Sequence, residues 1–356
     1  MKKMMYIVDA HEDVAWNALA LGRDVRRSVP ETRLLEKGSD IPRRGGTRMV
    51  GLPEWLAGGV AVVFGTLFVE PARKSYSKPH TYTTAEEAHE LAWAQLDYYH
   101  RLADECEQVA SIGTRVELDA VLTSWQGKKP QVGIVPLMEG ADPIREPAEA
   151  EMWFERGVRL VGLSWLTGSS YAGGNASPGP LTDNGRELLE VMAELGMVLD
   201  VSHLAEEAFV EAMDRYEGWV VASHANPRAR VPGQRQLSDA MIRRLAERDG
   251  VIGIVPYNAF LRPGWSKGDP KNAVTPADVA AAVDHVCQVV GDVAHVGLGS
   301  DFDGGFGAES TPLEIDTVAD LRRIIPALGE MGYGEEEVAA VMGGNWLRLL
   351  RKALPE

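Results

Sequence analysis

Side chains that commonly bind metal ions are the clearest chemical signal in this sequence. Three histidines and two acids each lie at or just beyond the end of a short apolar segment: His11, Asp13, Glu139, His203 and His224. Imidazole and carboxylate groups suit zinc and similar divalent ions. Five such groups exceed the four ligands of one tetrahedral ion, and they match a pair of ions about 3.5–4 Å apart that share a carboxylate. Glu139 is the candidate for the shared ligand, because it lies in the middle of the set.

The segments that must position these residues are predicted to be buried parallel strands. Eight short apolar runs alternate with helical patterns, which is typical of parallel strands covered on both faces. Eight such units predict a single (β/α)8 TIM barrel over residues 1–356, and no Gly-rich phosphate turn of an open sheet follows the first run. The runs are Tyr6–Asp9, Val60–Leu67, Val132–Leu137, Val158–Leu163, Met197–Val201, Trp219–Ala222, Val251–Val255 and Ala294–Gly299.

The placement of the metal-type residues carries more weight than any one of them. An isolated His-x-Asp is common by chance, and a lone histidine at a strand end is usually structural. Here three histidines and three acids, with Asp301 as the third, fall at the same end of five different predicted strands. Barrel enzymes build their active sites at that C-terminal end. The remaining histidines do not join the pattern and are interpreted as surface or core residues: His80, His89, His100, His285 and His295.

Local signals also predict the helices between the strands. Thr84 and Glu87 form a capping-box pattern that opens a helix of about Ala85–Glu107. Further helices are predicted at Arg186–Leu195, from Ser238 or Asp239 to Arg248, from Pro276 to about Gly291, from about Glu335, and at Asn345–Lys352. Two irregular stretches, Asp24–Pro53 and Phe68–Tyr82, follow early strands and are expected to form a lid and specificity surface.

Composition restricts the classes of partner and the compartment. The net charge of −16, from 52 acidic and 36 basic residues, argues against nucleic acid and against an anionic membrane as partners. No apolar stretch reaches the length of a membrane span or of a secretion signal, so we expect a cytoplasmic protein. The two cysteines, Cys106 and Cys287, form no Cys-x-x-Cys pair and are expected to be reduced thiols.

At these residues the chain closely resembles the membrane dipeptidase (renal dipeptidase) family of zinc peptidases, in the form of a soluble bacterial-type member. The resemblance runs from His11 to Arg348, nearly the whole chain. Each motif alone is a moderate signal, and their order and spacing together are specific. The motifs are His11-x-Asp13, Glu139-Gly140-Ala141-Asp142, Leu181-Thr182-Asp183-x-Gly185-Arg186, Asp200-Val201-Ser202-His203, Ser223-His224-Ala225, Gly299-Ser300-Asp301-Phe302-Asp303-Gly304 and Gly343-Gly344-Asn345-Trp346-Leu347-Arg348.

The family pattern, carried over by position, implies a role for each site residue. It implies two zinc ions per chain, the first held by His11, Asp13 and Glu139 and the second by Glu139, His203 and His224. The ions would activate a bridging hydroxide, although the ligand set is also compatible with manganese or cobalt. Asp301 would be the catalytic acid and base. Arg235 is the best match for the arginine that binds the terminal carboxylate of the substrate, and Arg228 and Arg230 lie close by.

The chain also departs from the family pattern. Trp165 stands after the fourth strand, where renal-type members carry a histidine that contacts the substrate, so we expect a bulky apolar wall there. Trp16, after the first strand, is a further candidate for such a wall. Tyr257, after the seventh strand, is a candidate for contact with the substrate. Glu12, between the first two ligands, is expected to be a charged group beside the metals.

Three functions from different classes remain open at this stage. The first is a dipeptidase that cleaves L,L dipeptides and, as the family does, tolerates a D-residue at the C-terminal position. The second is a related amidohydrolase that acts on N-acyl amino acids, lactones or esters with the same metals. The third is a metal-binding scaffold without catalysis, which the presence of Asp301 and of every expected ligand disfavours. Family members are often dimers, so a homodimer is compatible with the resemblance.

Overall fold

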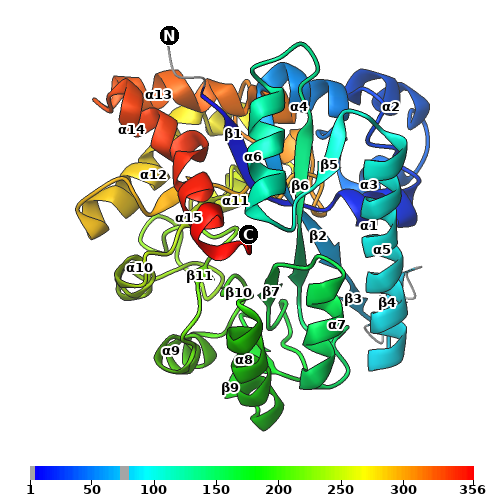
Figure 1. Cartoon of the computed structure of the whole chain (residues 1–356). Coiled ribbons are helices and arrows are strands. Elements are labelled where there is room, and N and C mark those ends of the chain that lie inside the picture. Colours follow the sequence, from blue (N-terminus) through cyan, green and yellow to red (C-terminus); the bar gives the residue numbers. More distant parts are fainter. Residues whose placement is uncertain (1–4, 73–79) are drawn as a thin grey trace.

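Eight parallel strands form a nearly closed barrel with helices packed around it (Figure 1). The computed structural model describes residues 5–72 and 80–356. The strand order is β11-β10-β7-β6-β2-β1-β13-β12, and an isolated parallel bridge between Ala222 and Ile252 links the two ends of this order. The barrel strands are β1 (Ile7–Glu12), β2 (Val60–Phe68), β6 (Val132–Glu139), β7 (Leu160–Gly162), β10 (Val198–Asp200), β11 (Val220–Val221), β12 (Ile252–Ile254) and β13 (Val296–Leu298).

The predicted fold class is confirmed, and each of the eight apolar runs overlaps a barrel strand. The later strands are shorter than predicted, because the barrel pairs only two or three residues of each of them. A short strand that was not predicted, β5 (Val109–Ser111), pairs with the beginning of β6. Two small pairs lie outside the barrel: β3 (Glu70–Pro71) with β4 (Thr81–Tyr82), and β8 (Ala172–Gly174) with β9 (Ser177–Leu181).

The helices begin and end largely where the local signals place them. Thr84 and Glu87 form the capping box of α5, and Gly196 ends α8 in a left-handed conformation. The helices are α1 (Val14–Leu21), α2 (Val29–Leu35), α3 (Ile41–Gly45), α4 (Leu52–Gly58), α5 (Ala85–Glu105), α6 (Arg115–Ser124), α7 (Ala150–Glu155), α8 (Asp183–Leu195), α9 (Glu206–Arg215), α10 (Asp239–Glu247), α11 (Asn258–Leu261), α12 (Pro276–Val290), α13 (Ile324–Glu330), α14 (Glu335–Ala339) and α15 (Asn345–Ala353). None of the helices in the described part of the chain is long and apolar enough to cross a bilayer.

The two stretches expected to be irregular differ from each other. Asp24–Pro53 contains the short helices α2 and α3, each with a proline in its first turn, and the first turn of α4. Its description as irregular was therefore wrong in part. Within Phe68–Tyr82, the strands β3 and β4 pair with each other, and residues 73–79 lie outside the described residues.

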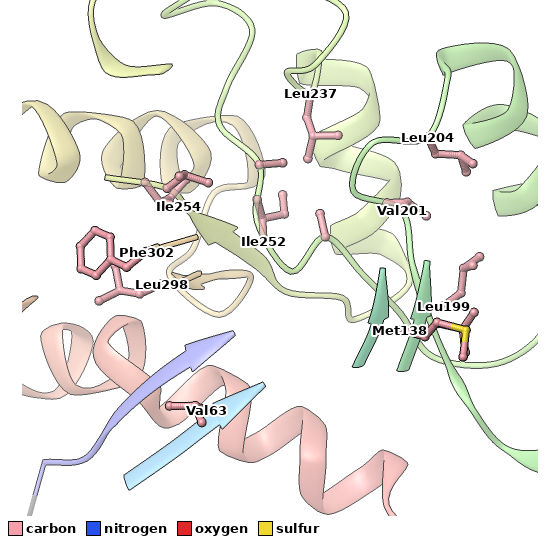
Figure 2. Packing of buried hydrophobic residues seen from close by; sticks show 14 of the residues in the cluster. Val63, Met138, Leu199, Val201, Leu204, Leu237, Ile252, Ile254, Leu298 and Phe302 are labelled. Carbon is pink, nitrogen blue, oxygen red and sulfur yellow. The ribbon is translucent and has the colours of Figure 1, made fainter. Parts of the chain in front are cut away.

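Two apolar clusters hold the barrel together. One contains alternate strand residues such as Val8, Phe64 and Val135 together with Trp346 of α15, which packs edge-on against Phe64 with 5.2 Å between ring centroids. The other joins the strands to the surrounding helices and to the loops after the strands, and Figure 2 shows part of it, including Met138 and Leu199. Alternation along each strand thus separates the interior of the barrel from its outer shell.

The C-terminal motif closes the barrel at the end opposite the predicted site. A Cβ atom on Gly343 would lie 2.6 Å from the carbonyl oxygen of Tyr6, before the start of β1. The Asn345 amide donates hydrogen bonds to the backbone carbonyls of Val293 and Val296, around the start of β13. Figure 1 shows α15 in front of the strands at this end. The motif therefore has a structural place in this chain, away from the candidate metal ligands.

Candidate metal centre

The predicted site residues come together at the C-terminal end of the barrel. His11, Glu139 and His224 place ligand atoms within 4.8 Å of one another, and so do His11, Asp13 and Asp301. His203 joins through contacts with Glu139 and His224. The side chains are buried or nearly so, and Asp301 is the most exposed of them at 18%. Five strand ends thus supply one compact cluster of imidazole and carboxylate groups.

Glu139, the last residue of β6, directs its two oxygen atoms toward different histidines. Oε2 lies 3.4 Å from Nε2 of His11, whereas Oε1 lies 3.2 Å from Nε2 of both His203 and His224. One carboxylate therefore faces two separate histidine environments. This is the arrangement that a carboxylate shared by two ions requires.

His11 and Asp13 converge for a reason other than simple strand alternation. The register of β1 against β2 shifts between Asp9 and Glu12, and the strand ends at Glu12, so that Asp13 lies outside it as the residue that precedes α1. The Asp13 carboxylate is held by the hydroxyl of Thr66 on β2. His11 and Asp13 therefore lie together as predicted, although β1 is not the regular strand that the prediction assumed.

Glu12 does not have the place expected for it. Its carboxyl group is buried and accepts hydrogen bonds from Nε1 of Trp55, at 3.0 and 2.9 Å. Burial and the neighbouring Asp9 carboxyl raise the pKa of Glu12 well above its usual range. The carboxyl group is therefore directed to Trp55 of α4, where its charged form is disfavoured, and not to the place beside the metals that was expected for it.

Two site residues adopt backbone conformations that are uncommon for residues other than glycine. His203 has φ of 65° and Asp301 has φ of 57°. The Asp301 amide donates a hydrogen bond to the carbonyl of His11 at 3.0 Å, which fixes the loop after β13 against β1. A Cβ atom on Gly304 would lie 2.2 Å from Oδ1 of Asp301 and 2.9 Å from Oδ2 of Asp13, so glycine leaves room for both carboxylates. Such local strain is typical of functional sites.

The charges of the cluster are strongly coupled. Burial disfavours the imidazolium form of His11, but the carboxylates of Glu139, Asp301 and Asp13 outweigh burial and raise the pKa of His11 to about 9. Burial is also the largest influence on Glu139, yet His11 and the other histidines hold its pKa well below the usual range. For Asp13, burial and Glu139 raise the pKa to about 6, and for Asp301 burial raises the pKa well above its ordinary value. Burial and Arg235 lower the pKa of His203 to about 4.

The donor atoms of the cluster fit divalent cations. Nε2 of His11 is buried and lacks a hydrogen-bond partner among the described residues. Nε2 of His203 and Nε2 of His224 lie 3.0 Å apart, and Nδ1 of His203 lies 3.0 Å from the amide oxygen of Asn175. An amide oxygen only accepts, so Nδ1 carries the proton and Nε2 presents a lone pair. A cation in front of such lone pairs and carboxylates satisfies groups that otherwise lack partners.

A buried ionic network fixes the loops around the cluster. Asp303, two residues after Asp301, pairs with Arg48 at 2.9 Å and accepts hydrogen bonds from the amides of Met49 and Val50, at 2.9 and 3.0 Å. Asn17 donates hydrogen bonds to the backbone carbonyls of Asp303 and Asp13. The stretch between α3 and α4 is therefore tied directly to the loop that carries Asp301.

Arg235 lies beside the cluster. Its Nη2 donates a 2.7 Å hydrogen bond to the carbonyl of His224, and its guanidinium lies 5.5 Å from the ring centre of Phe260. Nη1 is buried without a hydrogen-bond partner among the residues of the described ranges. Arg228, one of the two alternatives, forms an ion pair with Glu206 at 2.6 Å. The structure thus brings Arg235, rather than Arg228, to the candidate centre.

Aromatic residues border the cluster on two sides. Trp165 packs against Phe68, with 5.0 Å between ring centroids, and lies 6.1 Å from the ring of His203. Trp16 continues this wall through Phe68 at 6.4 Å. Tyr257 stacks on Phe306 at 4.4 Å, and burial followed by the charge of Asp301 raises its pKa. Phe68, the last residue of β2, begins the stretch expected to form a specificity surface, whereas Phe306 was not singled out in the sequence.

The histidines outside the pattern are engaged elsewhere. His89, His100 and His295 contact backbone carbonyls, and His285 pairs with Asp239. His80 lines a small apolar hollow beside Trp16, Leu91 and Gln95.

Three polar residues that contact the candidate ligands were not predicted from the sequence, namely Asn175, Asp200 and Ser223. Two of these lie within motifs quoted for other residues, whereas Asn175 stands in no recognisable pattern.

Comparison with known proteins gives consistent matches. The family model described as membrane dipeptidase (Peptidase family M19) matches residues 1–354. An uncharacterised protein in the pqqA 5′ region of Klebsiella pneumoniae is 31% identical over 62% of this chain and 82% of its own length. Dipeptidase tcpJ of Claviceps purpurea is 33% identical over 55% of this chain, which spans 45% of that relative. A metallopeptidase from Rhodobacter sphaeroides, solved with a phosphinate mimic of L-Ala-D-Ala, shares the fold with a TM-score of 0.78 and 24% identity, over 99% of this chain and 100% of that one.

Proposed function

The chain belongs to the membrane dipeptidase family (Peptidase family M19), whose members are metal-dependent peptide hydrolases, and on this premise we propose that it hydrolyses dipeptides with two zinc ions. His11, Asp13 and Glu139 would hold one ion, and Glu139, His203 and His224 the other. The observation that carries the proposal is the divided carboxylate of Glu139, with one oxygen toward His11 and the other toward His203 and His224. Two ions bound there would polarise the scissile carbonyl and make water nucleophilic at neutral pH.

The residues of the chain supply the remaining steps. Asp301, 3.9 Å from Nε2 of His11 and partly exposed, takes the proton of the attacking water and delivers it to the nitrogen of the leaving amine. The bond from the carbonyl carbon to that nitrogen then breaks, which leaves a free carboxylate and a free amine. Buried surroundings around Glu139 and His224 exclude competing water.

Arg235 and the aromatic walls would select the substrate. The unpaired Nη1 of Arg235 is available to a carboxylate, and a paired, charge-assisted hydrogen bond there would favour dipeptides over longer chains. Trp165, beside His203, and Tyr257, stacked on Phe306, would contact substrate side chains. The relative solved with a mimic of L-Ala-D-Ala supports including L,D dipeptides among the substrates to be tested.

The test is an assay of purified protein on L,L and L,D dipeptides. N-acetylated and C-amidated dipeptides serve as controls, and each assay is run before and after chelation and again after return of zinc. We expect cleavage that requires metal and that falls sharply when the C-terminus is amidated. A protein that holds two metals and cleaves lactones or N-acyl amino acids, but no dipeptide, would contradict the dipeptidase proposal.

A further inference from the structure

Behind the candidate metal centre, a single hydroxyl group contacts two of the three histidines. Ser223 Oγ lies 2.8 Å from Nδ1 of His224 and 3.3 Å from Nδ1 of His11. It also contacts Oδ2 of Asp200, and the Ser202 hydroxyl is a more distant neighbour at 3.4 Å. In the proposed two-ion centre, His11 would bind one ion and His224 the other, so these residues belong to different halves of the centre. The Ser223 hydroxyl is therefore a physical link between the two halves.

The number of donors and acceptors fixes the direction of these hydrogen bonds. Oδ1 of Asp200 already accepts from the backbone amides of Ser202 and Ser223, at 3.0 and 2.9 Å. The Ser223 hydroxyl donates its one proton to Oδ2 of the same carboxyl group. The two lone pairs of Ser223 Oγ then accept from Nδ1–H of His11 and of His224.

This direction determines which ring nitrogen of each histidine faces the metals. When the rings are neutral, as metal binding requires, a hydrogen held on Nδ1 leaves the lone pairs of His11 and His224 on Nε2, the atom that lies on the side of Glu139. Outer hydrogen bonds of this kind orient metal-binding histidines and raise their basicity. His203 is held separately, through Asn175 at 3.0 Å. Ser223 thus acts on both halves of the centre, whereas Asn175 acts on one.

We infer that Ser223, supported by Asp200, is a positioning residue that sets the tautomers of His11 and His224 together and so couples the filling of the two metal positions. The inference rests on the proposed two-ion centre. Loss of the hydroxyl frees both rings at once, which lowers the affinity for both ions. Loss of the Asn175 amide frees only His203 and lowers the affinity for one.

Three variants test the inference, with zinc as the probe in chelator-buffered titrations of the full chain. Ser223→Ala removes the hydroxyl, and we expect the affinity for both ions to fall by about 10–100-fold. Ser202→Ala is the matched control, because Ser202 Oγ accepts from the His224 backbone amide at 3.1 Å and contacts no imidazole in the described ranges. Asn175→Ala should lower the affinity for one ion only. Unchanged affinity in Ser223→Ala, or a loss restricted to one ion, would overturn the inference.

A second measurement keeps the test decisive if Ser223→Ala does not fold. Asp200→Asn keeps the size of the side chain but offers an N–H to Ser223, so the hydroxyl proton turns toward an imidazole and disfavours the Nδ1–H form. Nitrogen NMR of the zinc-loaded wild-type chain should show Nδ1–H on His11 and His224, and the zinc-loaded variant should lose that form for at least one of them. Nε2–H on both rings in the zinc-loaded wild type would refute the inference. A wild type that binds no zinc would instead count against the proposed function.

Discussion

Oε2 of Glu139 lies 3.4 Å from Nε2 of His11, and both groups are buried at the C-terminal end of the barrel. The other oxygen of the same carboxylate lies 3.2 Å from His203. No other acid in the described part of the chain contacts three of the candidate histidines. Glu139 is consequently the residue on which both proposed metal positions depend.

Replacing Glu139 by Gln should remove metal from both positions. The amide keeps the size of the side chain but loses the charge that offsets two cations, so we expect affinity for both ions to fall by at least about a hundredfold, more than an outer-shell change causes. Metal analysis after dialysis measures the stoichiometry. Glu149→Gln, at a partly buried carboxylate paired with Arg145, is the control and should retain full metal. Two firmly bound ions in Glu139→Gln would contradict the bridging role.

Asp301→Asn separates metal binding from proton transfer. Asp301 lies 3.9 Å from His11 and is not needed to complete either proposed set of three ligands. We expect the variant to keep two ions and to lose turnover by at least about a hundredfold, because the amide cannot carry the proton to the leaving amine. Metal content and kcat are measured on the same preparation. Near-normal kcat would exclude Asp301 as the acid and base.

Arg235→Met tests recognition of the carboxylate. The variant keeps much of the apolar stem but loses the guanidinium over Phe260 and its charge-assisted hydrogen bonds, whose net value is about 1.5–3 kcal/mol. We expect kcat/KM for free dipeptides to fall by roughly 10–150-fold, while the slow cleavage of C-amidated dipeptides changes little. Arg228→Met, which removes the ion pair with Glu206, is the matched control. Equal losses on both substrates would show that Arg235 acts elsewhere.

Zinc binding should release protons and strengthen as pH rises. Without metal, His11 has a pKa of about 9 because of the surrounding carboxylates, so it is protonated at pH 7 and must lose that proton to bind an ion. Each displaced proton makes the apparent affinity increase by up to about tenfold per pH unit below that pKa. His203, with a pKa of about 4, is already neutral at pH 7 and releases none. Calorimetry at pH 7 in buffers of different ionisation enthalpy measures the release, and identical heats in all buffers would rule it out.

Asp303→Ala should destabilise the fold by removing the partner of a buried arginine. Arg48 is 1% exposed and pairs with Asp303 at 2.9 Å, so the variant leaves a buried charge without its counter-ion, at a cost of about 3–5 kcal/mol. Asp24→Ala breaks the pair with Arg26, whose side chain is 48% exposed, and should cost about 0–1 kcal/mol. Denaturant unfolding compares the two variants. A cost for Asp303→Ala as small as that of Asp24→Ala would disprove this anchoring role.

Local chemistry explains why the sequence predicts the fold class and the composition of the site. Apolar runs, the capping box of Thr84 and Glu87, and the glycine after α8 act over a few residues, so their meaning does not depend on distant parts of the chain. His11, Glu139 and Asp301 each come at or just after the end of a parallel strand. Because the C-terminal ends of the barrel strands lie together, the sequence also predicts that these residues meet.

Only the tertiary structure decides which groups touch. The register shift in β1 turns Glu12 toward Trp55, and the ion pair of Arg228 leaves Arg235 beside His224. The Ser223 hydroxyl reaches His11 across 212 positions of sequence. Such contacts depend on how several strands and loops pack at once, and the free energy that selects them comes from long-range burial and hydrogen bonding. The sequence by itself determined the barrel and the kinds of candidate ligand it carries, and packing determined which atoms face each proposed metal position.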